Sequence, residues 1–176
     1  MMPASARSQH QATTSSRGKV VFDKRFITPF LVTTKKVVAT MAGIEVAAQK
    51  PELVKIRDMV GHIASVMPMA TPNVEGHLTM SFMIPTLLEL TSKMVMEECT
   101  KVDQLVLDTA AELTNMVAGG AKAMLERIDF DFNMTRPVVY QSAHFGDIPY
   151  TGKSKIRVPY LISGGAFFIE LSFIHK

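Results

Sequence analysis

The chain has 176 residues, of which 47% are hydrophobic and 20% are charged, a composition typical of a globular protein and not of a disordered one. The net charge of +3 arises within the first nineteen residues, so the rest of the chain is neutral. This excludes the dense basic surface of a nucleic-acid-binding protein. We interpret the one basic cluster, Lys153, Lys155 and Arg157, as the solvated edge of a strand.

The single cysteine, Cys99, excludes a disulfide framework and a multi-thiolate metal site, and we predict no metal site. No apolar run approaches the roughly 18 residues of a transmembrane helix, so we expect no contact with a membrane. Residues 1–22 are rich in polar residues and lack the apolar stretch of a signal peptide. We therefore expect a flexible N-terminal tail, followed by a single domain over residues 23–176 in the cytoplasm.

The first half of the chain begins with a predicted helix over residues 24–42, with Pro29 in its first turn and Gly43 as its stop. A short strand is predicted over residues 44–51. Clear strand patterns follow, and the turn residues between them indicate a hairpin. These two strands are predicted within residues 58–69 and 75–84.

The second half begins with two predicted helices, over residues 85–98 and 103–127, the second capped by Asp103. A stripe of apolar residues at helical spacing marks the buried face of the second helix. The members of this stripe are Val106, Ala110, Leu113, Val117, Ala121 and Met124.

Short extended segments follow over residues 130–133 and 136–142. The chain closes with a predicted hairpin of residues 154–162 and 166–175. This order of elements predicts an α+β fold: a mostly antiparallel sheet built from hairpins, with two or three long helices packed on one face.

The predicted helix over residues 103–127 carries a strip of polar residues and bare backbone on the face away from the core. At about 100° per residue, Asp108, Glu112, Asn115 and Gly119 fall within about 60° of one another. Asn is a weak helix former, and Gly119 and Gly120 together cost the helix about 1.5–2 kcal/mol relative to Ala. Such a cost indicates that something approaches this helix closely, either an element of the same chain or another protein.

The sequence around this strip, ELTNMVAGG, resembles the E-x-x-N-x-x-x-G helix signature of the CheC/CheX/FliY family of chemotaxis phosphatases. VGHIASV and VEGHLTMSF look like the central hairpin of that family, RPVVYQSAHF like the strand after the signature helix, and AFFIELSF like the closing strand. The resemblance covers about residues 24–176. Only one copy of the signature is present, which points to the single-site CheX type.

The resemblance implies a phosphatase that hydrolyses the phospho-aspartate of a CheY-like response regulator. By this carry-over, Asn115 would orient the attacking water and Glu112 would contact the regulator's active-site lysine. Asp108 and Gly119 would belong to the docking surface, although Asp108 could instead favour the first turns of the helix through its dipole. The chain would need no cofactor of its own, because the regulator carries Mg²⁺.

The resemblance also implies a homodimer formed by strand pairing across two subunits, and we predict the closing hairpin as the edge that pairs. Two other functions stay open. One is a non-catalytic adaptor that binds a response regulator or a flagellar motor component. The other is a small-molecule sensor with a pocket between the helices and the sheet.

Overall fold

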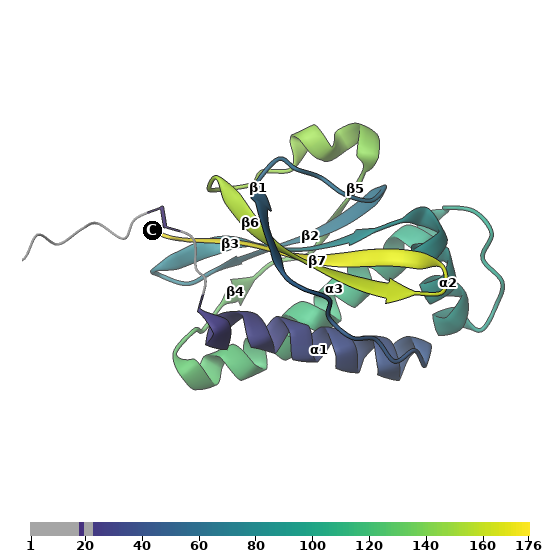
Figure 1. Cartoon of the computed structure of the whole chain (residues 1–176), viewed down its shortest axis with the longest axis horizontal. Helices are drawn as coiled ribbons and strands as arrows, with labels where there is room; N and C mark the ends of the chain where they lie inside the picture. Colours follow the sequence, from purple (N-terminus) through teal and green to yellow (C-terminus); the bar gives the residue numbers. More distant parts are fainter. Residues whose placement is uncertain (1–17, 20–22) are drawn as a thin grey trace, which may run out of the picture.

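The computed structural model describes residues 18–19 and 23–176, in which three helices lie on one face of an antiparallel sheet (Figure 1). The helices are α1 (Lys24–Ala42), α2 (Ile84–Val95) and α3 (Gln104–Leu125), with short 3-10 turns η1 (Glu126–Ile128) and η2 (Ser142–Asp147). The strands are β1 (Glu52–Lys55), β2 (Ile63–Ala70), β3 (Val74–Phe82), β4 (Asn133–Met134), β5 (Val138–Gln141), β6 (Ser154–Ile162) and β7 (Gly165–His175). The predicted α+β fold is confirmed.

The strands of the sheet follow the order β1-β6-β7-β3-β2-β4, and β5 pairs with β2 beside β4. Both predicted hairpins are present, as β2–β3 and β6–β7. The prediction that the closing hairpin forms a free edge is wrong, because β7 pairs with β3 and β1 covers the other side of β6. Among the described residues, the edges of the sheet are β1 at one end and β4 with β5 at the other.

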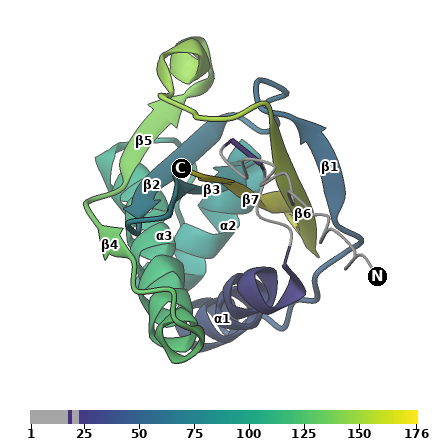
Figure 2. The ribbon, with the colours of Figure 1, turned by 90° about the vertical axis from the view of Figure 1, so that its left-hand side faces the viewer.

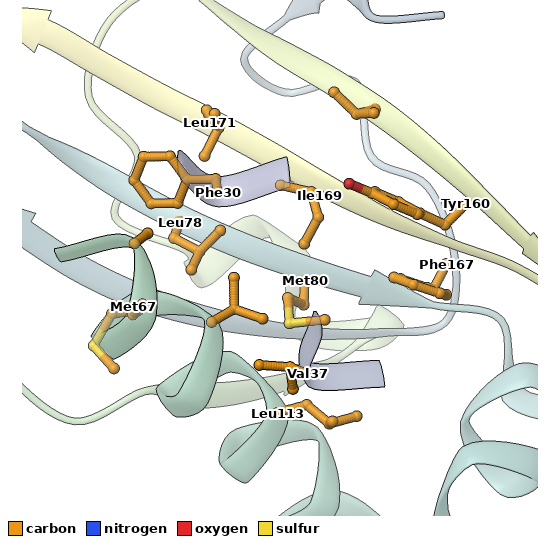
Figure 3. Packing of buried hydrophobic residues seen from close by; sticks show 14 of the residues in the cluster. Phe30, Val37, Met67, Leu78, Met80, Leu113, Tyr160, Phe167, Ile169 and Leu171 are labelled. Atoms are coloured by element: carbon orange, nitrogen blue, oxygen red, sulfur yellow. The ribbon is translucent and has the colours of Figure 1, made fainter. Parts of the chain in front are cut away.

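The main core lies between the helices and the sheet. Alternate side chains of β3 and β7 point toward α1 and α3 and are buried, as the period of two predicts. Figure 3 shows this packing, with labels on Phe30 and Val37 of α1, Met67 of β2, Leu78 and Met80 of β3, Leu113 of α3, Tyr160 of β6, and Phe167, Ile169 and Leu171 of β7.

The first part of the chain differs from its prediction in two places. α1 has the predicted bounds and ends at Gly43 in the left-handed conformation, but Asp23 caps it, so Pro29 lies inside the helix and not in its first turn. The predicted strand over residues 44–51 is wrong: this segment makes only an isolated bridge, between Ala48 and Tyr160, and the strand begins after Pro51.

The predicted N-terminal tail lies outside the described residues except for Gly18 and Lys19. The backbone N–H of Gly18 donates a hydrogen bond to His175 O at 2.6 Å, and His175 N donates to Lys19 O at 2.9 Å. In the part of the chain that the structure describes, no helix is both long and apolar enough to cross a membrane.

The opposite face of the sheet is covered in part by the segment from β5 to Tyr150 (Figure 2). Phe145 and Ile148 from this segment pack on Ala64 and Val66 of β2. The cover explains why this face of β3 is also buried, although its side chains are polar.

Beneath the same cover, two residues of the predicted solvated cluster are buried, so that interpretation is wrong for Lys155 and Arg157. Lys155 Nζ lies 3.0 Å from Glu170 Oε2, and Arg157 Nε lies 2.7 Å from Glu170 Oε1. The side chains of Lys155 and Glu170 are fully buried, and the Tyr150 ring lies 4.8 Å from the Lys155 ammonium. Burial lowers the pKa of Lys155, and the Glu170 carboxylate opposes that shift. Two cations are tolerated here because both contact the Glu170 carboxylate, and Arg157 Nη1 also lies 3.6 Å from Asp58 Oδ1.

The two glycines of α3 face different surroundings. A Cβ atom on Gly120 would overlap the methyl group of Thr33 on α1, whereas a Cβ atom on Gly119 would meet nothing within 4 Å. The cost of Gly120 to the helix is therefore explained by the close approach of α1. No packing within the described chain explains Gly119.

We expect opposite effects from alanine at these two positions. Gly119→Ala should raise the free energy of unfolding by about 0.5–1 kcal/mol, because Ala is the better helix former and the space is open. Gly120→Ala should lower it, because overpacking costs about 1–3 kcal/mol and exceeds the helix gain. Urea denaturation of both variants checks this, and equal effects at the two positions would contradict it.

Removing the shared carboxylate should be strongly destabilising. Glu170→Gln leaves Lys155 buried without an anion and leaves Arg157 only the Asp58 carboxylate at 3.6 Å, and we expect a loss of about 3–5 kcal/mol in the free energy of unfolding. The matched control is Glu45→Gln, an exposed residue whose replacement should change stability by less than about 0.5 kcal/mol. Similar denaturation midpoints for the two variants would show that the cations do not depend on Glu170.

Candidate functional site

Helix α3 is fixed by its cap and by its apolar face. The carboxylate of Asp103 accepts a hydrogen bond from Val106 N at 3.1 Å, as predicted for the N-cap. The first five members of the predicted stripe are fully buried, but Met124 is only half-buried and Leu125 takes the last buried position. The helix therefore presents its predicted apolar face to the core.

The predicted polar strip lies on the opposite side of α3. Asp108, Glu112, Asn115 and Gly119 are all exposed, as helical periodicity predicts. Glu112 and Asn115 are one turn apart, so their side chains can act on the same partner.

The strip forms one wall of a shallow groove of about 440 Å³. Its lining residues are Asp108, Ala111, Glu112, Asn115, Arg136 and Pro137. The structure thus brings together three of the four predicted residues, while Gly119 lies beyond the groove on the same face. Sequence reasoning missed Arg136 and Pro137 as site residues. Both residues lie at the start of the extended segment predicted over residues 136–142, and nothing in the sequence marked them as part of the site.

The second wall of the groove is the linker between β4 and β5. These two strands run along the sheet edge beside α3 (Figure 2). Both strands pair with β2: Met134 is opposite Met69, and Val138 is opposite Val66. Between these pairs, two residues of β2 face three residues of the linker. The linker therefore has one residue more than the stretch of β2 opposite it, and the strand pairing is interrupted there.

The polar groups of the groove are mostly without partners in the chain. Gln104 Nε2 donates a hydrogen bond to Asp108 Oδ1 at 2.7 Å. The side chains of Glu112, Asn115 and Arg136 make no hydrogen bond or ion pair with any residue in 18–19 or 23–176. The groove therefore offers two carboxylates, one amide and one guanidinium to an incoming molecule.

The described residues contain no group of three or more His, Cys, Asp or Glu side chains placed to hold a metal ion. The groove also contains no Ser, Cys or His that could act as a nucleophile. What these residues can do chemically is to bind a charged partner and to orient a water molecule by the amide, which both donates and accepts hydrogen bonds.

Comparisons with solved structures give close matches over most of the chain. A CheC-like superfamily protein from Shewanella sp. PV-4 has a TM-score of 0.76 and 31% identity, covering 86% of this chain and 99% of that one. The chemotaxis protein CheX from Vibrio vulnificus has a TM-score of 0.73 and 30% identity, covering 84% of this chain and 98% of that one.

A third similar structure is CheX of Borrelia burgdorferi in a complex with CheY, BeF3 and Mg²⁺. It has a TM-score of 0.72 and 25% identity, and the match covers 85% of this chain and 97% of that one. A comparison with curated proteins gave no match.

The family model described as "Chemotaxis phosphatase CheX" matches residues 63–161, more than half of the chain. This span includes the β2–β3 hairpin, α3 with its polar strip, and the linker that forms the second wall of the groove. The chain therefore belongs to the CheX family of chemotaxis phosphatases.

Proposed function

We propose that this chain accelerates hydrolysis of the phospho-aspartate on a CheY-like response regulator. The observation that carries the proposal is the exposure of Glu112 and Asn115, one turn apart in the same groove and without partners among the described residues. An exposed carboxylate and amide at this spacing, on a rigid helix, suit a site that is completed by another protein. Membership of the CheX family supports the same activity.

In the proposed reaction, Asn115 orients a water molecule in line with the acyl phosphate. The water oxygen attacks phosphorus, and a water proton passes to a phosphoryl oxygen or to solvent. The bond between phosphorus and the aspartyl oxygen breaks, and the carboxylate leaves with the electron pair. Because a carboxylate is a good leaving group, the chemistry needs positioning more than it needs a general acid.

Glu112 has the proposed role of pairing with the active-site lysine of the regulator. An amide suits position 115 because a second carboxylate next to the phosphoryl group would repel its oxygens. Asp108 would extend the docking surface toward the start of α3. The open space at Gly119 would let the backbone of the partner approach the helix closely.

The Borrelia complex supports a CheY-like partner, because its CheX is bound to CheY together with BeF3 and Mg²⁺. Mg²⁺ would come with the regulator, where it would neutralise charge on the phosphoryl oxygens. The groove residues of this chain would then supply the oriented water and the docking contacts.

Homodimer formation by strand pairing stays a prediction, as does the cytoplasmic location. If two copies pair through their sheets, β1 is the edge away from the groove, and its Leu53 is 61% exposed. Pairing there would leave the groove of each copy accessible.

Asn115→Ala should abolish most of the activity. We expect the rate of phosphate release from a phosphorylated CheY-like regulator to fall by about 100-fold, as when one preorganised polar group is removed from an active site. Fold stability should not fall, because Ala is the better residue inside a helix.

The matched control for this variant is Gln49→Ala, which removes an exposed amide far from α3 and should leave the rate unchanged. An Asn115→Ala protein as active as the wild type would refute the assigned mechanism. Binding of the regulator without any acceleration by the wild type would instead favour the adaptor function.

Glu112→Gln should act mainly on binding. Loss of the carboxylate that pairs with the partner's lysine should raise KM by about tenfold or more, with a smaller change in kcat. Steady-state kinetics on the phosphorylated regulator measure this split, with Glu45→Gln as the exposed control. A fall in kcat at unchanged KM would place Glu112 in the chemical step and contradict the docking role.

A further inference from the structure

Arg136 is the only cation among the described residues that line the groove. It lies across from a helix wall that carries Asp108 and Glu112. Both carboxylates would repel a phosphoryl group, which carries a charge of about −2 at neutral pH. Even with Mg²⁺ on the regulator, a cation on this surface would reduce that repulsion, and Arg136 is the cation that lines the groove.

The position of Arg136 is built by the fold. Strands β4 and β5 are both paired with β2, so the three-residue linker between them is held at both ends. Pro137 fixes its own φ and restricts Arg136 to extended backbone. Opposite the linker, β2 contains Pro68, which offers no N–H for a regular ladder. The two prolines, one in β2 and one in the linker, thus favour the interruption of pairing at which Arg136 lies.

The guanidinium is also available. Two carboxylates line the same groove, yet no carboxylate of the described residues comes within 4.0 Å of Arg136, and its side chain is exposed. Its N–H donors form a planar fork that matches phosphate oxygens. This contrasts with Arg157, which is buried and neutralised by Glu170.

We propose that Arg136 binds the phosphoryl oxygens of the partner's phospho-aspartate and so makes this surface prefer the phosphorylated regulator to the unphosphorylated one. The inference rests on the proposed function, since it takes the same partner and the same groove. Arg136 acts in recognition, whereas Asn115 acts on the water.

The test measures the dissociation constant of a CheY-like regulator in two states, at one fixed ionic strength. One state carries Mg²⁺ and BeF3, which stands in for the phosphoryl group, and the other carries Mg²⁺ alone. Calorimetry is run with the wild type, Arg136→Ala, Arg136→Lys and Arg127→Ala. The last is the matched control, because Arg127 is an exposed arginine beyond the other end of α3.

Arg136→Ala should weaken binding of the BeF3-loaded regulator by about tenfold or more, the range for a hydrogen bond to a charged group, and binding of the unloaded regulator by less than about twofold. Arg136→Lys should recover part of the loss, because it keeps the charge but not the fork. Arg127→Ala should change neither constant. The four proteins should also show equal thermal stability, since the exposed Arg136 side chain makes no hydrogen bond or ion pair within the described residues.

An equal loss for both states of the regulator would overturn the proposal, because Arg136 would then bind a permanent group of the partner. Unchanged binding by Arg136→Ala would overturn it as well. If the wild type binds the loaded regulator but does not speed its dephosphorylation, the proposed catalysis fails while the Arg136 comparison is still decided. If the wild type binds neither state, both proposals fall.

Discussion

The close packing of α3 against α1 and the sheet is the constraint on which the candidate site depends. Gly120 allows Thr33 of α1 to approach the helix backbone, and the buried stripe from Val106 to Ala121 holds the other side on the core. With two sides fixed, α3 cannot rotate without exposing apolar surface. Its remaining face is therefore held toward solvent in one orientation, as a site that acts on a second protein requires.

The two adjacent glycines illustrate how one helix serves both packing and recognition. Gly120 is required by the fold, because any Cβ atom there meets Thr33. No described neighbour requires a glycine at position 119. Packing within the described chain therefore does not offset the stability that the helix loses there relative to Ala. In the sequence, Gly119 and Gly120 are an adjacent pair with the same expected cost to the helix. The structure separates them into a packing residue, Gly120, and an exposed residue with open space around it, Gly119.

The helical wall of the site could be predicted from the sequence because a period of 3.6 residues is a local property. The two hairpins could be predicted for the same reason, from the alternation of apolar and polar residues and from the turn residues between the strands. Arg136 could not be placed, because its position depends on the pairing of β4 and β5 with β2, which is a long-range property. The same limit explains the error at Lys155 and Arg157. Their partner, Glu170, lies on the neighbouring strand, and Tyr150 and Met59 contact Lys155 from a distance in the chain.

The groove is shallow, and under the proposed function its chemistry is shared with the regulator that docks there. An acyl phosphate on a partner already supplies the activated bond and the leaving group. In the proposed function, this chain would add an amide and a docking carboxylate on helix α3 and a guanidinium on the linker between β4 and β5. Under this division, selectivity depends on charge at the rim of the groove, and rate depends on the position of one amide. Replacements at Arg136 and Asn115 should therefore separate affinity from turnover.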